Sequence, residues 1–176
     1  MQDPKLPVQT YSDCLRSPTQ QWHLTELNPR AMRGVQVHMD RKSYHETTFL
    51  DHRIVRPDDQ KRHLLFDKKR LDRNRPKPAV DFVFHISFCG STLLSRCLDV
   101  PGQRLALREP LVLRQIWEVG KLYPEEFNSA RQQKLLRLIL PLLSKPSSRG
   151  ESVCIKPTNL MVDLAGELLT ETRGKA

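Results

Sequence analysis

The stretch Ala79–Leu98, AVDFVFHISFCGSTLLSRCL, joins an apolar run to a turn of small residues and then to a segment with an apolar face. Residues 80–86 are mostly β-branched or aromatic, which is typical of a buried strand. Gly90 supplies backbone freedom in the turn, and the apolar residues after it recur at a spacing that predicts a helix over 91–99. Those apolar residues are Leu93, Leu94, Cys97 and Leu98. A strand that turns directly into a helix gathers backbone N–H groups and the positive end of the helix dipole at one point, so the stretch predicts a loop that binds phosphate or sulfate.

The loop differs from the common nucleotide-binding loops. A Walker A loop requires G-x-x-x-x-G-K-[ST], and neither its first glycine nor its lysine is present here. The G-x-G-x-x-G pattern of dinucleotide-binding folds is also missing. The pattern that remains, C-G-S-T-L-L after a strand, resembles the sulfuryl-donor loop of the P-loop sulfotransferases, which is typically P-[KR]-[ST]-G-[ST]-T.

The resemblance implies that this loop holds the 5′-phosphosulfate of 3′-phosphoadenosine 5′-phosphosulfate (PAPS). The implied donor-binding residues are Ser87, Phe88, Cys89, Gly90, Ser91 and Thr92. Gly90, Ser91 and Thr92 match the family pattern and would supply backbone and hydroxyl donors. Phe88 departs from it, because the family has a lysine or arginine there that neutralises charge as the sulfuryl group leaves, and a phenyl ring cannot do this.

Two later segments carry the resemblance further. The sequence RLALREP predicts a short strand over 104–108 that is followed by Glu109, and SVCIKPTN predicts another over 152–156 that ends in Lys156. Glu109 lies 21 residues after Phe88, the spacing at which the tyrosylprotein sulfotransferases have their catalytic base. Sulfotransferases also carry a strand-end lysine near the sulfuryl group of the donor. Together the motifs are most similar to the bacterial sulfotransferase-like proteins, and the resemblance covers 79–169, about half of the chain.

The resemblance implies in-line transfer of a sulfuryl group from PAPS to a hydroxyl of a small-molecule or peptide acceptor. Glu109 would take the hydroxyl proton from hydrogen-bond distance. Lys156 would stabilise charge at the transferring group and partly replace the basic residue that Phe88 lacks. Arg108 could share that role, but the alternation of side chains along a strand places it opposite Glu109.

Each of these residues also has a purely structural interpretation, which the sequence leaves open. Small residues between a strand and a helix are common in ordinary βα turns. Glu109 followed by Pro110 is a pattern typical of a helix start. Lys156 before Pro157 could be a solvated strand end.

Beyond residue 78 the chain alternates strands and helices, which predicts the α/β class with a parallel, P-loop NTPase-like sheet and flanking helices. The expected strands are 80–86, 104–108 and 152–156, and the expected helices are 91–99, 110–119, 125–143 and 160–169. A complete sulfotransferase domain continues with further strands and with groups that hold the 3′-phosphate of the donor. The sequence therefore predicts a sheet that is incomplete at the C-terminus, as in a fragment, a truncated product or a form completed by another chain.

The predicted division is into an N-terminal extension, 1–78, and the N-terminal part of a sulfotransferase-like domain, 79–176. Within the extension we expect an irregular arm over 1–19, a helix over 41–52 capped by Asp40, and a second helix over 58–71.

Composition limits the class of protein. With 176 residues and 38% hydrophobic content the chain can form a substantial core. No apolar run is long enough to span a membrane, and the first residues lack the apolar region of a signal peptide, so a cytoplasmic protein is expected. The cysteines Cys14, Cys89, Cys97 and Cys154 form no C-x-x-C pair; apart from Cys89, in the loop, we expect reduced core thiols. We expect no metal site.

The net charge is +9, and cations concentrate in a basic segment over 61–78. Such a segment can bind nucleic acid or an acidic partner, but Phe66 is its one aromatic residue, so base stacking is not indicated and a solvated helix is favoured. Two alternatives to the sulfotransferase hypothesis remain open: a non-catalytic anion-binding or nucleotide-binding module, and a basic protein that binds nucleic acid or another partner. Oligomeric state cannot be predicted.

Overall fold

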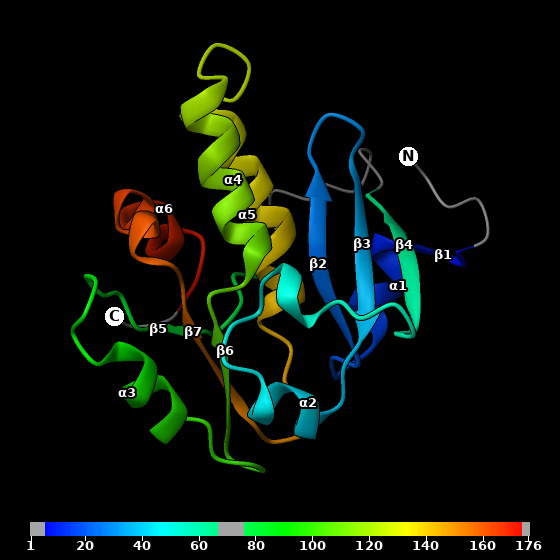
Figure 1. Ribbon diagram of the computed structural model, residues 1–176. Coiled ribbons are helices and arrows are strands. Elements are labelled where there is room, and N and C mark those ends of the chain that lie inside the picture. Colours follow the sequence, from blue (N-terminus) through cyan, green and yellow to red (C-terminus); the bar gives the residue numbers. More distant parts are fainter. Residues whose placement is uncertain (1–5, 67–75, 174–176) are drawn as a thin grey trace.

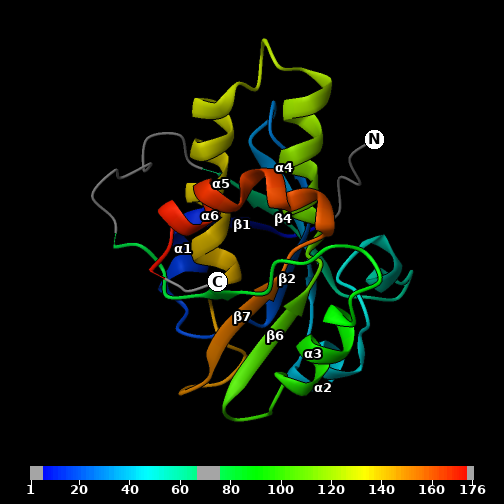
Figure 2. The same cartoon turned by 90° about the vertical axis from the view of Figure 1, so that its left-hand side faces the viewer.

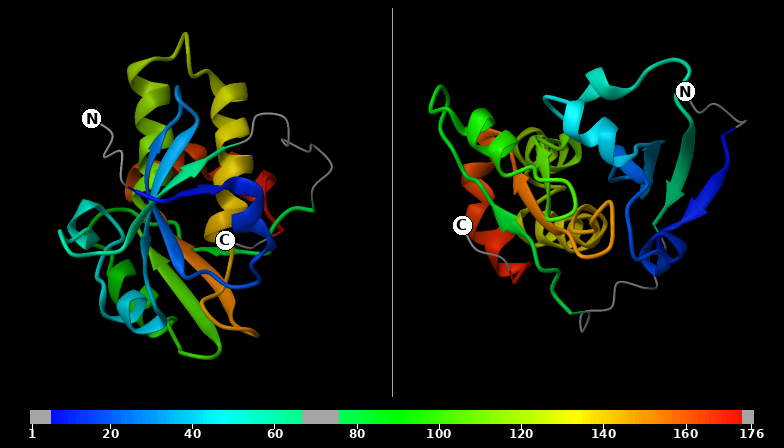
Figure 3. Two further views of the ribbon diagram at one scale, coloured as in Figure 1. Left: turned by 90° about the vertical axis from the view of Figure 1, so that its right-hand side faces the viewer. Right: turned by 90° about the horizontal axis from the view of Figure 1, so that it is seen from below.

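The computed structural model describes residues 6–66 and 76–173. In this part of the chain it shows a mixed α/β protein in which two long helices lie between a mostly antiparallel sheet and a smaller parallel sheet (Figures 1 and 3). Buried apolar residues of both sheets and of these helices belong to one hydrophobic cluster. No helix in the described ranges is both long and apolar enough to cross a membrane.

The parallel sheet consists of β5 (Asp81–Phe82), β7 (Ser152–Lys156) and β6 (Arg104–Arg108), in that order. The strands predicted at 104–108 and 152–156 are confirmed residue by residue. The strand predicted at 80–86 is much shorter. Val83 still donates its N–H to the carbonyl of Ile155 (2.9 Å), after which the chain leaves the sheet. β5 is an edge strand, so no strand of the described residues pairs with its outer side and holds the rest of the apolar run extended.

The helices after residue 78 follow the predicted order with shifted ends. They are α3 (Ser91–Cys97), α4 (Leu111–Leu122), α5 (Ser129–Leu143), the 3₁₀-helix η3 (Asn159–Leu164) and α6 (Ala165–Thr170). α5 begins four residues later than predicted because Asn128 caps it, accepting the Arg131 N–H (3.1 Å). The predicted helix 160–169 divides into η3 and α6, which cross the view in Figure 2.

α3 buries the face opposite to the predicted one. Its apolar residues Leu93 and Leu94 are 69% and 51% exposed, whereas Ser91 and Ser95 are buried. Ser95 satisfies its hydroxyl by donating to the carbonyl of Thr92 (2.9 Å). Close packing of α3 on β6 favours the small serine face, so the predicted apolar stripe faces outward.

The N-terminal region contains a sheet that the sequence analysis did not predict. Its strand order is β1 (Val8–Thr10), β4 (Lys61–Leu65), β3 (Arg33–His38) and β2 (Trp22–Asn28). β1 and β4 are parallel, and the other pairs are antiparallel. The expected irregular arm over 1–19 is therefore wrong for its described residues, which form β1 and the helix α1 (Tyr11–Arg16), with Thr10 as its N-cap.

Of the two helices predicted in this region, the first is shorter than predicted and the second is replaced by a strand where it is described. Asp40 does cap α2 (Arg41–Glu46), accepting the Ser43 N–H at 2.7 Å, but the helix ends at Glu46 and a 3₁₀ turn, η1 (His52–Ile54), follows. The helix predicted at 58–71 is wrong where it is described, because β4 occupies 61–65. β4 pairs with strands on both sides, and these ladders override local helix propensity. Residues 67–75 of the basic segment lie outside the described residues.

Candidate functional site

The two predicted catalytic residues meet at the carboxyl ends of adjacent parallel strands. Lys156 is the last residue of β7 and Glu109 directly follows β6, with Arg108 opposite Lys156 in the register. The Glu109 N–H donates to the Lys156 carbonyl (2.6 Å), and the Lys156 ammonium donates to Glu109 Oε1 in an ion pair. The structure therefore brings together the two residues that the sequence placed 47 positions apart.

The two partners of this pair differ in burial. The Lys156 side chain is 1% exposed, whereas that of Glu109 is 24% exposed. The ammonium also lies 5.8 Å from the centre of the Phe49 ring, within cation–π range. Glu109 Oε2 accepts no hydrogen bond from any described residue. The arrangement thus holds a desolvated cation behind a carboxylate that has one oxygen free to accept a proton.

The backbone at Glu109 is held in an uncommon conformation. Its φ is +53°, in the left-handed region, which costs a non-glycine residue about 1 kcal/mol. Hydrogen bonds on either side fix it: Leu50 N–H donates to the Arg108 carbonyl (2.7 Å), and Leu111 N–H donates to the Leu50 carbonyl (2.9 Å). Such strain is concentrated at functional sites in proteins, and here it turns the chain at the carboxylate.

His85 joins the pair, and sequence analysis missed it. Its Nε2 lies 3.0 Å from the Pro157 carbonyl oxygen and 3.9 Å from Glu109 Oε1, and its Nδ1 lies 3.1 Å from the Ile86 carbonyl oxygen. A neutral imidazole has one N–H and can donate to only one of these carbonyls. The available signal was a single polar side chain inside the apolar run of 82–86.

The predicted anion loop follows β5 at the same end of the sheet. Residues 87–90 form a turn whose backbone enters the left-handed region at Phe88 (φ +59°) and at Gly90 (φ +76°). A Cβ added at Gly90 would meet open space, so the glycine is needed there for its backbone angle. The Asn159 amide donates to Ser87 Oγ (3.0 Å), which ties the start of the loop to the segment after Lys156.

The six loop residues do not all face one point. Ser87, Phe88, Cys89 and Gly90 are exposed, Thr92 is half-buried and Ser91 is buried. The pKa of the exposed Cys89 is lowered, first by the Ser91 hydroxyl and then by the Ser91 N–H. Within the described ranges no hydrogen bond or ion pair joins 88–92 to Glu109 or Lys156.

Arg108 is excluded from the role considered for it. Its side chain is buried and donates to the carbonyls of Tyr44, His45 and Thr47. Its guanidinium therefore fixes the C-terminal end of α2 together with Thr47 and is not available to an anion at the strand ends.

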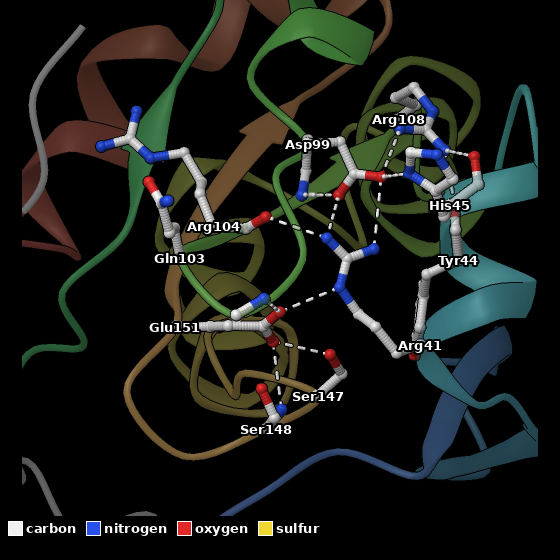
Figure 4. A network of polar contacts seen from close by, with 12 residues as sticks. Arg41, Tyr44, His45, Asp99, Gln103, Arg104, Arg108, Ser147, Ser148 and Glu151 are labelled. Atoms are coloured by element: carbon white, nitrogen blue, oxygen red, sulfur yellow. Dashed lines mark hydrogen bonds and ion pairs between the residues drawn. The ribbon is translucent and has the colours of Figure 1, made fainter.

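A second charged cluster, which we call the Asp99 network, extends from the residues before β6 and β7 to Arg108 at the end of β6 and is shown in Figure 4. It consists of Arg41, His45, Asp99, Arg108 and Glu151. Arg41 donates to Asp99 Oδ1 (2.8 Å) and to Glu151 Oε1 (2.9 Å), while His45 Nδ1 lies 2.8 Å from Asp99 Oδ2. The network joins α2 to the residues before β6 and β7, which makes it a structural connection.

Both carboxylates of the network have lowered pKa values. Burial acts to raise the pKa of Asp99, but the Ala106 N–H, Arg41 and His45 outweigh it. Burial likewise opposes the shift at Glu151, where hydrogen bonds from Ser147 and Arg41 and from two backbone N–H groups bring the pKa to about 2. Both side chains are therefore held as anions in the folded protein.

Other predicted features have mixed outcomes. Cys14 and Cys154 are buried as predicted, but Cys97 is exposed, contrary to expectation, because α3 turns that face outward. Arg62 of the basic segment belongs to β4, where it lies over the Trp22 ring (4.2 Å) and donates to Gln36 Oε1 (2.8 Å). It is thus not the solvated helical cation that was predicted. Among the described residues no group of three or more His, Cys, Asp or Glu side chains could hold a metal ion.

Comparison with protein-family models, with curated proteins and with solved structures finds no match to this chain.

Proposed function

We propose that this protein is a P-loop sulfotransferase-like enzyme that transfers a sulfuryl group from PAPS to a hydroxyl acceptor. The observation that carries the proposal is the Glu109–Lys156 ion pair at the carboxyl ends of β6 and β7, next to the turn that follows β5. Parallel α/β sheets bind their ligands outside the carboxyl ends of the strands. A proton acceptor, a buried cation and a loop of exposed backbone are what sulfuryl transfer from a phosphosulfate requires.

Each group has one role in the proposed reaction. Glu109 takes the acceptor hydroxyl proton. The acceptor oxygen forms a bond to sulfur as the bond between sulfur and the bridging oxygen of PAPS breaks, and the electron pair stays on the phosphate of adenosine 3′,5′-bisphosphate (PAP). Lys156 offsets negative charge on the transferring group. Gly90, Ser91 and Thr92, with Ser87 and Cys89, form the turn that receives the phosphosulfate.

The second candidate is a non-catalytic module that binds the nucleotide without transferring the sulfuryl group. Phe88 favours it, because the side chain at the position of the family's basic residue is fully exposed and carries no charge. Lys156 already has a carboxylate partner and is buried, so it replaces that basic residue only if it exchanges Glu109 for the donor.

The two candidates are separated by a transfer assay. The full chain is incubated with PAPS and a panel of phenols and alcohols, and PAP and sulfate esters are measured by mass spectrometry. An enzyme forms both in equal amounts, and Glu109→Gln lowers the rate by roughly 10²–10⁴-fold, the usual contribution of a general base. Asp163→Asn, which alters an exposed ion pair with Lys121, is the control and should leave the rate unchanged.

Two results would contradict the enzymatic proposal. Binding of PAP without any transfer supports the non-catalytic module, and transfer at an equal rate by wild type and Glu109→Gln removes Glu109 from the mechanism.

A further inference from the structure

A pocket of about 430 Å³ lies beside the strand-end site, on the N-terminal side of the molecule. Its size is in the range of small-molecule sites. It is lined by the end of β3, by α2 and by the chain that runs from α2 past η1; the lining residues used below are Val37, Met39, Glu46, Phe49, Arg53, Ile54, Arg56 and Asp59. The segment between α2 and η1 passes beside the end of β6 in Figure 1.

The wall of the pocket is attached to the strand that carries Glu109. Arg108, the residue before Glu109, donates from its buried guanidinium to the carbonyls of Tyr44 and Thr47. Its own carbonyl accepts the Leu50 N–H (2.7 Å). The pocket therefore has a fixed position relative to the carboxylate at the strand end.

Phe49 links the pocket to the ion pair. Its ring lines the pocket, and it lies 5.8 Å from the Lys156 ammonium and 5.0 Å from the Arg53 guanidinium, measured to the ring centre. Arg53 in turn interacts electrostatically with Glu109. Phe49 and Arg53 thus belong both to the lining of the pocket and to the surroundings of the ion pair.

The pocket lining is more polar than apolar; it includes four apolar side chains and one cation that has no ion-pair partner among the described residues. Val37 and Met39 are buried, and Phe49 and Ile54 are half-buried. Arg56 is exposed, and its guanidinium makes no ion pair or hydrogen bond with any described residue.

The other charged groups of the lining have partners. Arg53 pairs with Asp51 (2.6 Å) and Glu46 with Lys42 (3.7 Å). Asp59 accepts the Arg56 backbone N–H (2.6 Å).

We propose that this pocket holds the hydroxyl acceptor and that the acceptor is a small, partly apolar alcohol or phenol with an acidic group that binds Arg56. The assignment of the ligand as the acceptor rests on the proposed function. The apolar body lies against Phe49 and Ile54, and the acid meets the guanidinium. The hydroxyl extends from the pocket past Phe49 toward Glu109, which is not itself a lining residue.

Three phenols of similar size that differ in charge test the proposal: 4-hydroxyphenylacetate, the neutral 4-hydroxyphenylethanol and the cationic tyramine. Binding to the full chain is followed by amide chemical-shift changes in nuclear magnetic resonance spectra. We expect the affinity to fall in that order and the perturbed amides to include those of Phe49 and Ile54. Arg56→Gln should weaken 4-hydroxyphenylacetate by about tenfold, the loss of one charge-assisted contact, and leave the neutral phenol unchanged.

Arg149→Gln removes an exposed arginine outside the pocket and is the matched control, with no expected effect. Equal affinity for the three phenols, or an Arg56→Gln variant that binds like wild type, would overturn the proposal. A parallel titration with PAP separates it from the proposed function. If PAP binds and no phenol does, the pocket assignment fails alone; if the acid binds and PAP does not, the acid site stands and the sulfotransferase proposal fails.

Discussion

Two charged clusters adjoin the strands β6 and β7, the Asp99 network and the Glu109–Lys156 pair, and they are built differently. In the Asp99 network two buried carboxylates share Arg41, and each accepts further hydrogen bonds from side chains and backbone. At the carboxyl end the buried Lys156 has one carboxylate partner, and Glu109 keeps an oxygen without a hydrogen bond among the described residues. The backbone is strained at Glu109 (φ +53°).

This difference distinguishes a cluster that stabilises the fold from one that is able to bind a ligand. Buried carboxylates that accept several hydrogen bonds, as Asp99 and Glu151 do, stabilise one arrangement of the surrounding elements. A buried cation with a single, partly exposed partner can exchange that partner for a ligand. Substitutions in the Asp99 network should therefore change stability most, and those at the carboxyl end should change binding and turnover most.

The largest effect on stability is expected from Asp99→Asn. The change leaves Arg41 and Arg108 facing each other with no charge between them, and loss of one partner from a buried ion pair costs about 3–5 kcal/mol. Urea denaturation gives the free energy of unfolding. Asp163→Asn, at an exposed pair with Lys121, is the control and should cost less than about 1 kcal/mol. Equal losses in the two variants would show that the network does not hold the fold.

Acid should weaken the Asp99 network through Glu151. Because its folded pKa is about 2, below the usual value of 4.5, the stabilisation is complete above pH 4.5 and is lost as the pH falls from 4.5 toward 2. The full loss is about 3 kcal/mol. Glu151→Gln should lack this pH dependence in urea denaturation at a series of pH values.

Buried His23 causes a separate loss of stability as the pH falls. Burial lowers its pKa to about 3, so the unfolded chain binds a proton first and stability falls as the pH drops below 6.5. Wild type and Glu151→Gln share this loss, and the difference between their curves isolates Glu151. Parallel curves from pH 6 to pH 3 would contradict the assignment.

At the carboxyl end the two members of the pair should respond unequally. Glu109→Gln leaves Lys156 buried without a counter-charge and should cost about 2 kcal/mol, whereas Lys156→Met removes the buried charge and should stay within about 1 kcal/mol of wild type. Both variants should lose PAPS turnover. Thermal denaturation with the transfer assay measures both effects, and a Lys156→Met variant less stable than Glu109→Gln would contradict this account of the pair.

The smallest effect is expected in the loop. The Cβ that Gly90→Ala adds meets no atom, but the alanine must adopt a left-handed backbone conformation. This should lower stability by about 1 kcal/mol. Gly166→Ala, where the added Cβ also meets no atom and φ is ordinary, should instead stabilise α6 by about 0.5 kcal/mol. Equal changes in the two variants would show that the conformation of the loop is not fixed in solution.

The parallel unit was predictable because β6 and β7 each contain three consecutive apolar residues. Residues 104–108 and 152–156 are buried almost throughout, and buried parallel strands have this sequence signature. The N-terminal sheet was missed because polar residues are buried in it. In β2, His23 and Thr25 are 0% and 1% exposed, so the strand shows no alternation of polar and apolar residues.

The site was predicted in part for a similar reason. Lys156 ends one strand that the sequence predicts, and Glu109 directly follows the other. Parallel topology therefore brings the two residues together. The contribution of His85 depends on how the chain leaves the sheet after Val83. The burial of Arg108 depends on carbonyls at the end of α2 and directly after it. These contacts between segments far apart in sequence leave no local pattern.

The most direct test of the central claim is a calorimetric titration of the full chain with PAP. We expect micromolar binding to wild type, at least tenfold weaker binding to Gly90→Asp and tighter binding to Phe88→Arg. Aspartate tolerates the left-handed backbone better than most residues and places a negative charge in the loop, while arginine restores the family's cation. Absence of binding to folded wild type, or equal affinity for wild type and Gly90→Asp, would contradict the claim that the strand ends and the loop form a site for the sulfuryl donor.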